Sequence, residues 1–382
     1  MEPENKIYDC AIIGGGLAGL CLAIQLADQG ISVVLLEKNE YPFHKVCGEY
    51  ISMESWDFIT GLGLPLGSFN LPIIDSLGIS SERGFMLNQS LEMGGFGISR
   101  YSLDHYLYQL AIDKKVSIYQ NCRVNSVHKS DNQFQEIDTT IGKFQASIIC
   151  GSYGKYIPSF IQKNEKYHGH DDRKGTNYIG VKYHIKSDLA ENRIELHNFK
   201  NGYCGISKVD KDWHCLCYLT TAENLQNNGK EIKTMEENVL YKNPFLKNYF
   251  TKSEFVSSNP LVISNIQFRK KQTDLGDSFF LLGDAAGTIT PLCGNGMSMG
   301  MRASKLLSKE LLKYFDNKCS IEEVSSAYRK SWNTAFNSRI IAGYYLQNVF
   351  GKKNTTHFAL KLLSKTPGLM RKLITLTHGE KF

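Results

Sequence analysis

The feature that most constrains this chain is a glycine-rich turn close to its start. Gly14, Gly16 and Gly19 fit the pattern G-x-G-x-x-G between a buried strand expected over residues 7–13 and a helix expected over residues 17–29. In that context the first glycine permits a tight turn, the second lets a pyrophosphate approach the backbone, and the third lets the helix pack on the strand. The chain is therefore predicted to open with a dinucleotide-binding βαβ unit and a parallel sheet.

An acidic residue completes this motif. Glu37 ends a second buried strand, expected over residues 32–37, and would accept hydrogen bonds from the adenosine ribose. The start of the 17–29 helix offers free N–H groups to phosphate. The residues assigned here to the dinucleotide are Gly14, Gly15, Gly16, Ala18, Gly19, Glu37 and Lys38. This motif alone leaves NAD and FAD as alternatives.

A second segment, far along the chain, favours FAD. A buried strand over residues 279–283 ends in Gly283 and Asp284, and Asp284 at that edge would bind a ribityl hydroxyl. Asn295, Gly296 and Met297 would then present backbone N–H groups at a helix start. The positive end of that helix dipole would stabilise the negative charge of a reduced flavin.

Composition sets the broad class of the protein. A length of 382 residues predicts about two domains, and 42% hydrophobic with 21% charged residues excludes disordered, collagenous and polytopic membrane proteins. Ten scattered cysteines in so long a chain indicate a reducing, cytoplasmic compartment. The uncharged stretch 10–27 is interpreted as the βα turn rather than as a membrane span, because glycines crowd its middle and no basic region precedes it.

The expected fold is α/β: a Rossmann-like FAD-binding domain, an inserted antiparallel β-sheet domain for the substrate, and a helical C-terminal segment. A helix capped by Ser102 is expected over 102–113, strands over 116–128 and 145–150, and helices near 295–315, 321–350 and 356–376. The expected division is 1–70, 98–174 and 271–320 for the FAD-binding domain, 71–97 and 175–270 for the substrate domain, and 321–382 for the C-terminal segment.

The basic surplus of the chain lies at its C-terminus. Residues 301–382 carry 15 Lys and Arg against 5 Asp and Glu, a balance of +10 within a total of +6. A solvated helical surface is the simplest interpretation, and contact with a membrane surface or an acidic carrier protein is the alternative. Nucleic acid is not expected as a partner.

Three motifs together resemble the FAD-dependent enzymes of the aromatic-hydroxylase and geranylgeranyl-reductase superfamily. These are the glycine turn with Glu37, the run Ser99-Arg100-x-x-Leu103-Asp104, and Gly283-Asp284-Ala285-Ala286-Gly287. The resemblance covers residues 5 to about 310. It implies that Arg100 contacts the flavin and that the strand around Val124 holds the adenine through its backbone.

The run Lys45 to Tyr50 is similar to the Cys-Gly-Glu segment of the geranylgeranyl-reductase branch, which implies that Cys47, Gly48 and Glu49 lie beside the isoalloxazine. Cys47 could then donate a proton or tune the flavin, and Glu49 could orient it. The structural alternative is that Cys47 packs as a small hydrophobic residue and Glu49 is a hydrogen-bonded loop acid.

Two segments depart from the family. Of the reductases' Tyr-x-Trp-x-Phe-Pro motif only Tyr203 remains in residues 202–207, and residues 150–155 replace the hydroxylases' Asp-Gly motif. The Trp-x-Trp-x-Ile-Pro motif and catalytic lysine of the flavin halogenases are not found, so halogenation is not expected. The chain has no second G-x-G-x-x-G, so the reductant is expected to be NAD(P)H that binds only transiently, or else another electron donor.

The predicted function is therefore an FAD-dependent oxidoreductase that reduces a double bond in a lipophilic prenyl, polyene or polyketide-derived substrate. Its alternatives are an FAD-dependent monooxygenase of an aromatic or isoprenoid substrate and a non-catalytic FAD electron-transfer protein. Cys293 could be redox-active, but an inert loop cysteine is the favoured interpretation. No metal site is expected at His168 to Asp172 or elsewhere, and the basic run at 269–271 is expected to face water.

Overall fold

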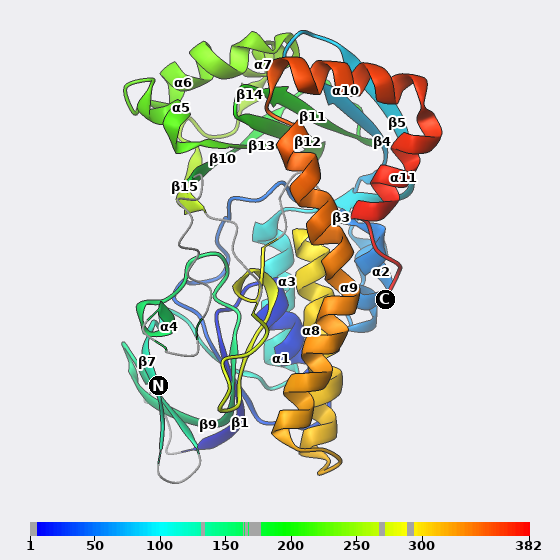
Figure 1. The fold of residues 1–382 in the computed structure, drawn as a ribbon. Helices are drawn as coiled ribbons and strands as arrows, with labels where there is room; N and C mark the ends of the chain where they lie inside the picture. Colours follow the sequence, from blue (N-terminus) through cyan, green and yellow to red (C-terminus); the bar gives the residue numbers. More distant parts are fainter. Residues whose placement is uncertain are drawn as a thin grey trace.

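Two β-sheets, one at each end of the molecule, are joined by helices that run between them (Figure 1). The computed structural model describes residues 6–130, 134–162, 164, 167, 177–266, 272–288 and 294–382. Within these residues no helix is long and apolar enough to cross a membrane. The mixed α/β class predicted from the sequence is confirmed.

The first sheet contains the predicted βαβ unit. Its strands run in the order β6-β2-β1-β9-β8-β7, and β16 also pairs with β9. Their bounds are β1 (Ile7–Ile13), β2 (Val33–Leu36), β6 (Ser117–Tyr119), β7 (Val124–Lys129), β8 (Gln135–Thr139), β9 (Gly142–Gly151) and β16 (Phe279–Leu281). All four residues of β2 are buried, as the continuous apolar run of a covered parallel strand requires. The single strand expected over 116–128 is wrong: it is two strands, β6 and β7, separated by a turn.

Helices cover this sheet. They are α1 (Leu17–Ala27), α2 (Trp56–Gly61), α3 (Arg100–Asp113) and α4 (Ser159–Gln162). The N-cap expected for α3 is wrong: the cap is Ser99 and not Ser102. The backbone of Ser99 is extended, and its side chain accepts a hydrogen bond from the N–H of Ser102. The helix consequently begins at Arg100.

The second sheet has the order β14-β10-β13-β12-β11-β4-β5-β3, with β15 also on β10. Its strands are β3 (Tyr50–Ser52), β4 (Ile73–Ser80), β5 (Met86–Gly97), β10 (Tyr178–Lys186), β11 (Arg193–Phe199), β12 (Gly202–Lys208), β13 (His214–Thr221), β14 (Glu254–Phe255) and β15 (Leu261–Ile266). It is antiparallel except where β11 pairs with β4 in parallel. Three short helices lie on its outer face, and Met235 and Val239 of the second and Leu246 of the third pack against the sheet. Those helices are α5 (Ala222–Gln226), α6 (Ile232–Val239) and α7 (Pro244–Lys252).

The C-terminal part is helical, as predicted. It contains α8 (Gly296–Phe315), α9 (Ile321–Val349), α10 (Lys353–Lys365) and α11 (Pro367–Thr377). A capping box between Ser320 and Glu323 starts α9, which reaches from the first sheet to the second. The single helix expected over 356–376 is wrong: Pro367 cannot continue the hydrogen bonding of α10 and excludes Thr366 from the helical conformation, so the chain breaks into two helices.

Candidate active site

One cavity of about 1220 Å³ extends from the carboxyl ends of the first sheet to the inner face of the second. Its first half, the nucleotide groove, is lined by residues that include Gly14, Glu37, Val124, Ser152 and Asp284. Its second half, the apolar chamber, is lined by Leu77, Ile79, Ile194, Leu196, Leu363 and Ile374 among others. The volume exceeds the ~300–1,000 Å³ of an ordinary small-molecule site, so it has room for a long cofactor and a second ligand.

The glycine turn is shaped by close backbone approach. Gly14 has φ +102°, and a Cβ on it would lie 2.6 Å from the carbonyl oxygen of Ser152. A Cβ on Gly19 would lie 2.3 Å from the carbonyl oxygen of Gly14. Gly16 precedes α1 without a side-chain cap, so the N–H groups at the start of that helix are available to an anion in the groove.

Glu37 is fixed by its neighbours on the groove wall. One carboxylate oxygen accepts the backbone N–H of Gly15 at 2.8 Å, and the other accepts two hydrogen bonds from Asn39, at 2.9 Å and 2.7 Å. A carboxylate has about four lone-pair positions, so three are used within the protein. The remaining acceptor capacity of this 5%-exposed side chain suits a ribose hydroxyl.

An ion cluster stands where the groove meets the chamber. Arg100 donates two hydrogen bonds to the carboxylate of Asp104, at 2.7 Å and 2.8 Å, and the ammonium of Lys45 lies 3.0 Å from the same group. Burial alone would raise the pKa of Asp104, but the two cations lower it below its usual value. Arg100 is thereby held in place along the cavity wall.

Glu49 forms a second cluster beside the first, in which Glu49 and Lys182 are buried and His184 is half-buried. Lys182 donates a hydrogen bond to its Oε1, Arg100 donates its backbone N–H to the same oxygen at 2.7 Å, and His184 Nε2 lies 2.7 Å from Oε2. Burial would raise the pKa of Glu49, but His184 and Lys182 lower it below its usual value. Lys182 also donates to the carbonyl of Lys45 at 3.2 Å, so this cluster anchors both ends of the loop that carries Cys47.

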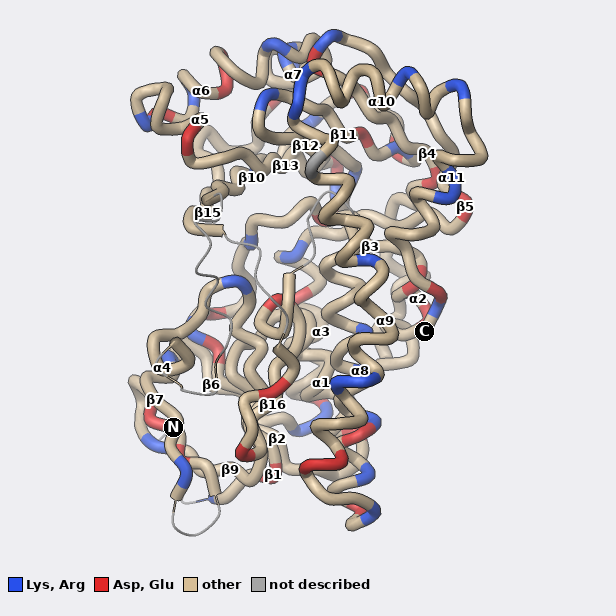
Figure 2. The backbone as a smooth tube through the Cα atoms, in the orientation of Figure 1, with Lys and Arg blue, Asp and Glu red and all other residues tan. Residues whose placement is uncertain are grey.

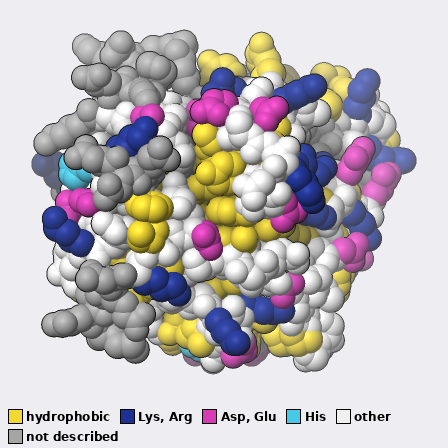
Figure 3. Space-filling view, turned by 90° about the horizontal axis from the view of Figure 1, so that it is seen from below, with side chains coloured by type: hydrophobic (Ala, Val, Ile, Leu, Met, Phe, Trp, Pro, Cys, Tyr) yellow, Lys and Arg dark blue, Asp and Glu magenta, His cyan; other side chains and the backbone are white. Residues whose placement is uncertain are grey.

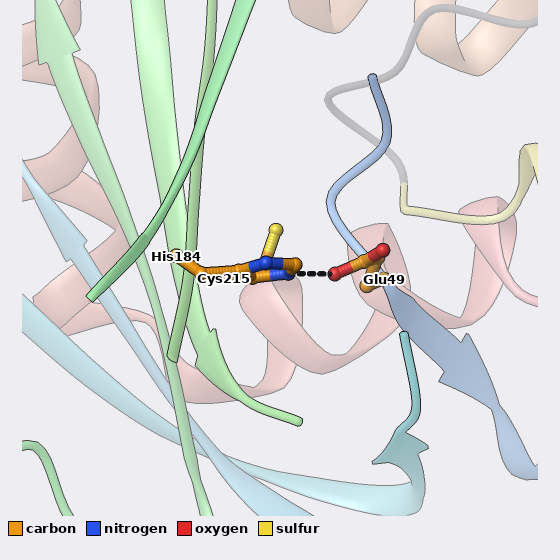
Figure 4. A group of neighbouring side chains, drawn as sticks. All are labelled: Glu49, His184 and Cys215. Carbon is orange, nitrogen blue, oxygen red and sulfur yellow. Dashed lines mark hydrogen bonds and ion pairs between the residues drawn. The ribbon is translucent and has the colours of Figure 1, made fainter. Parts of the chain in front are cut away.

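Glu49, His184 and Cys215 also bring three metal-ligand types within 4.8 Å of one another (Figure 4). Glu49 is already neutralised by the ammonium of Lys182, and the thiol of Cys215 donates to the carbonyl of Cys47 at 3.2 Å. Burial raises the pKa of Cys215, which disfavours the thiolate that a metal needs. Each of the three side chains thus already has a partner within the protein, and the expectation of a chain without a metal site stays a prediction.

Most of the predicted site residues line this one cavity. They are Gly14, Gly16, Ala18, Glu37, Lys38, Cys47, Gly48, Glu49, Arg100, Gly283, Asp284, Gly296, Met297 and Val124. Three predicted residues do not line the cavity: Gly15, Gly19 and Asn295. The backbone N–H of Gly15 donates to Glu37, which does line it, and the side-chain amide of Asn295 donates to the carbonyl of Thr377. Cys293, His168 to Asp172 and the 269–271 run lie outside the described residues.

The thiol of Cys47 lies at the boundary between groove and chamber. Its sulfur is 3.6 Å from the sulfur of Met297 and 3.5 Å from the backbone N–H of Glu49. Asp284 follows β16 in the short helical turn η4 (Gly283–Ala285), with Lys155 at 4.0 Å. These positions bring segments 45–50, 283–284 and 296–297 to one place.

Several residues of the site were not predicted from the sequence. Lys182 is buried and His184 half-buried on β10, and the chamber is closed by Leu360, Leu363 and Ile374 from α10 and α11. The sequence carries a signal for Lys182, because this lysine lies inside a strand whose neighbouring residues are apolar or aromatic. A charge buried in such a strand needs a partner of opposite charge.

FAD fits this cavity. Small residues permit a pyrophosphate at the start of α1, an anchored carboxylate lies on the groove wall for the ribose, and Gly296 and Met297 begin α8 beside Cys47. The groove and the chamber form one continuous cavity, so a second ligand in the chamber would contact a cofactor bound in the groove.

Comparison with known proteins agrees with this assignment. Residues 9–45 match the family model described as FAD dependent oxidoreductase. The chain is 23% identical over 322 residues to a 1H-pyrrole-2-carbonyl-[peptidyl-carrier protein] brominase of Pseudoalteromonas luteoviolacea, covering 78% of this chain and 76% of the relative. It is 19% identical over 405 residues to a digeranylgeranylglycerophospholipid reductase of Methanococcus vannielii, covering 97% and 98%.

Solved structures share the fold. Flavin-dependent brominase Bmp2 superposes with a TM-score of 0.78 at 17% identity, covering 97% of this chain and 93% of that one. PqsL of P. aeruginosa, solved with 2-aminobenzoylacetate, has a TM-score of 0.74 at 14% identity, covering 92% and 98%. Residues 9–45 are thus similar to FAD-dependent oxidoreductases, and the chain as a whole shares the fold of these solved flavin-dependent enzymes.

Proposed function

We propose that this FAD-dependent oxidoreductase acts on a lipophilic substrate and reduces one of its carbon–carbon double bonds. The observation that carries the proposal is the continuity between the nucleotide groove and the apolar chamber. Aliphatic side chains from β4, β11, α10 and α11 line the chamber, which suits a prenyl, polyene or polyketide-derived chain. One end of such a chain would lie at Cys47.

The reaction needs a hydride and a proton. The glycine turn, Glu37 and the start of α8 would hold FAD, which would supply hydride chemistry when bound and reduced, with NAD(P)H proposed as the transient source of the electrons. The thiol of Cys47 would donate the proton to the neighbouring carbon and regain it from solvent, so that two hydrogens are added in all. The N–H of Glu49, 3.5 Å from the sulfur, would stabilise the thiolate left behind.

The buried clusters would keep this thiol in position. Glu49 holds the backbone of Arg100, and Lys182 holds the carbonyl of Lys45, two residues before Cys47. Since the side chains of Glu49 and Lys182 are both buried, the loop has few ways to move away from the cofactor. Glu49 is accordingly a positioning residue in this proposal.

Monooxygenation of an aromatic or isoprenoid substrate is the second candidate. Its support is Gly205, which lines the cavity at the position where the reductases' motif has a bulky Trp and leaves room for a ring. Halogenation is not proposed. Among the described lysines, those on the cavity wall are Lys38, Lys45 and Lys155, which lie in the groove half, and Lys45 is paired with Asp104.

The test combines spectroscopy with product mass. The purified protein would be reduced anaerobically with NADPH or NADH, followed at the flavin absorbance, and then mixed with geranylgeraniol or a long-chain alkylphenol, with and without oxygen. Gain of two hydrogen atoms supports the reductase, and gain of one oxygen atom supports the monooxygenase. Flavin reduction without conversion of either probe would contradict both and indicate an electron-transfer protein.

Cys47→Ala tests the proton donor. We expect normal flavin content and a double-bond reduction rate lower by about 10²- to 10⁴-fold. Cys217→Ala is the matched control, because Cys217 is a second thiol on the cavity wall and burial raises its pKa to about 12. Equal loss of activity in the two variants would contradict the role given to Cys47.

A further inference from the structure

The helices α10 and α11 each have two apolar sides. Their inner sides close the chamber through Leu360, Leu363, Met370 and Ile374. Their outer sides expose large apolar residues to solvent: Phe358 is 67%, Leu362 61%, Leu369 47% and Leu376 44% exposed. An amphipathic helix that only packs on a core would be polar on that outer side, so the exposed residues need another explanation.

The charge of these helices is of one sign. Residues 352–378 contain six Lys and Arg and no Asp or Glu. Lys353 pairs with Glu82 at 3.1 Å and Arg371 lies 3.9 Å from Glu92. The other four, Lys352, Lys361, Lys365 and Lys372, are exposed, and no carboxylate of the described residues lies within ion-pair distance of them. Figure 2 shows the basic positions along both helices.

The apolar and basic residues share the same helix faces. Phe358, Lys361, Leu362 and Lys365 follow the spacing i, i+3, i+4 and i+7 on α10. Leu369, Lys372 and Leu376 follow the spacing i, i+3 and i+7 on α11. The opposite end of the molecule, seen from below in Figure 3, differs in that acidic and basic side chains are interspersed there.

We propose that the outer faces of α10 and α11 dock on a membrane with anionic headgroups. Lysines around exposed Phe and Leu are the pattern of a helix that lies in the interface, with its apolar side chains among the acyl chains and its ammonium groups at the phosphates. The apolar residues are spread along two successive helices rather than gathered around a pocket, which suits a lipid surface better than an acidic protein.

This docking deepens the proposed function and, in this respect, rests on it. The same two helices that meet the membrane on one side line the chamber on the other. A lipophilic substrate would therefore pass from the bilayer, between or beside α10 and α11, into the chamber without crossing water. The substrate class implied is a membrane-dissolved lipid rather than a soluble acyl or prenyl conjugate.

The test is sedimentation of the FAD-bound protein with vesicles. Vesicles of phosphatidylcholine and phosphatidylglycerol in equal parts are compared with vesicles of phosphatidylcholine alone. We expect binding to the first and little to the second, with binding weakened as salt shortens the Debye length. Each basic residue near an anionic surface contributes roughly a five-fold change in partitioning.

Two double variants test the docking surface, and a third double variant is the control for the change in charge. Lys361→Glu with Lys365→Glu, and Phe358→Ser with Leu362→Ser, should each lower partitioning by about ten-fold or more. All four residues are exposed, so folding and flavin absorbance should be unaffected. Lys309→Glu with Lys330→Glu makes the same charge change at exposed positions on α8 and α9 and should leave binding close to wild type.

The outcomes separate the alternatives. Wild-type protein that stays in the supernatant with anionic vesicles overturns the docking proposal, as does equal loss in the control variant. Retention on a polyglutamate resin without vesicle binding, lost in the lysine variant but not in the Phe358 and Leu362 variant, overturns it in favour of an acidic protein partner. Sedimentation needs no turnover, so docking without substrate conversion would contradict only the proposed reaction.

Discussion

Lys182 and Glu49 form an ion pair in which neither side chain is exposed to solvent, although the two residues are 133 positions apart in the chain. The pair joins β10 of the second sheet to the loop that follows the first βαβ unit. Since the loop also carries Cys47, the pair connects the stability of the protein to the geometry of its site.

Removing the ammonium from this pair should be strongly destabilising. Lys182→Met leaves the buried carboxylate of Glu49 without its main counter-charge, and we expect a loss of about 3–5 kcal/mol in the free energy of unfolding, measured by urea titration. Lys186→Met, on the same strand, removes an exposed pair with Glu254 and should have little effect. Adding Glu49→Gln to Lys182→Met should recover part of the loss, and additive losses would contradict the ion-pair explanation.

Glu236 should make stability depend on pH. Burial raises its pKa to about 7, although Tyr218 and Tyr183 donate hydrogen bonds to it at 2.7 Å and 2.9 Å. A carboxyl group whose pKa is raised in the folded state favours folding below its unfolded pKa, and that contribution is lost as pH rises through about 7. Glu236→Gln should therefore be more stable than wild type at pH 8 by up to about 3 kcal/mol and should differ little at pH 4.5.

Urea titrations of wild type and Glu236→Gln across this pH range check the prediction. Glu237→Gln, at the neighbouring exposed position of α6, is the control. Parallel pH profiles for wild type and Glu236→Gln would show that Glu236 is not protonated in the folded protein.

The glycine turn should tolerate no side chain. Gly14→Ala places a Cβ 2.6 Å from a backbone carbonyl and requires a left-handed conformation, so we expect loss of most bound FAD in the purified protein. The ratio of flavin to protein absorbance measures this. Gly61→Ala, where the added Cβ meets nothing within 4 Å, should keep a full flavin content. Full flavin absorbance in Gly14→Ala would contradict a cofactor site at the glycine turn.

Filling the chamber should affect the substrate and not the cofactor. A Cβ on Gly205 would make ordinary contacts, 3.5 Å from Leu196, so Gly205→Ala should be mild. Gly205→Leu should raise KM for a long-chain substrate by about ten-fold or more, while flavin content and anaerobic reduction stay normal. Steady-state kinetics with substrates of two chain lengths checks this, and an equal rise for both lengths would count against the chamber as the binding site.

The predictability of this structure follows the range of its interactions. The turn at Gly14 to Gly19 and Glu37 could be predicted because each depends on spacing within a few residues of the chain, whereas the cap of α3 was placed at Ser102 instead of Ser99. Lys182, His184 and the inner faces of α10 and α11 could not, since they reach the site only through contacts between distant segments. Pro367 by itself predicts a helix break at Thr366, but the apolar spacing on both sides of the proline also fits one continuous helix.

The position of β16 on β9 has a consequence for folding. Both β8 and β16 pair with β9. A short turn joins β8 to β9, whereas β10 to β15 all lie between β9 and β16 in the chain. Loop-closure entropy rises slowly with length, so the detour costs little at equilibrium, yet it delays the pairing. We expect refolding to form the β1-α1-β2 unit first and to capture FAD in a later kinetic phase, when Gly283 and Asp284 reach the groove. Simultaneous recovery of helical circular dichroism and flavin binding in stopped-flow refolding would exclude this order.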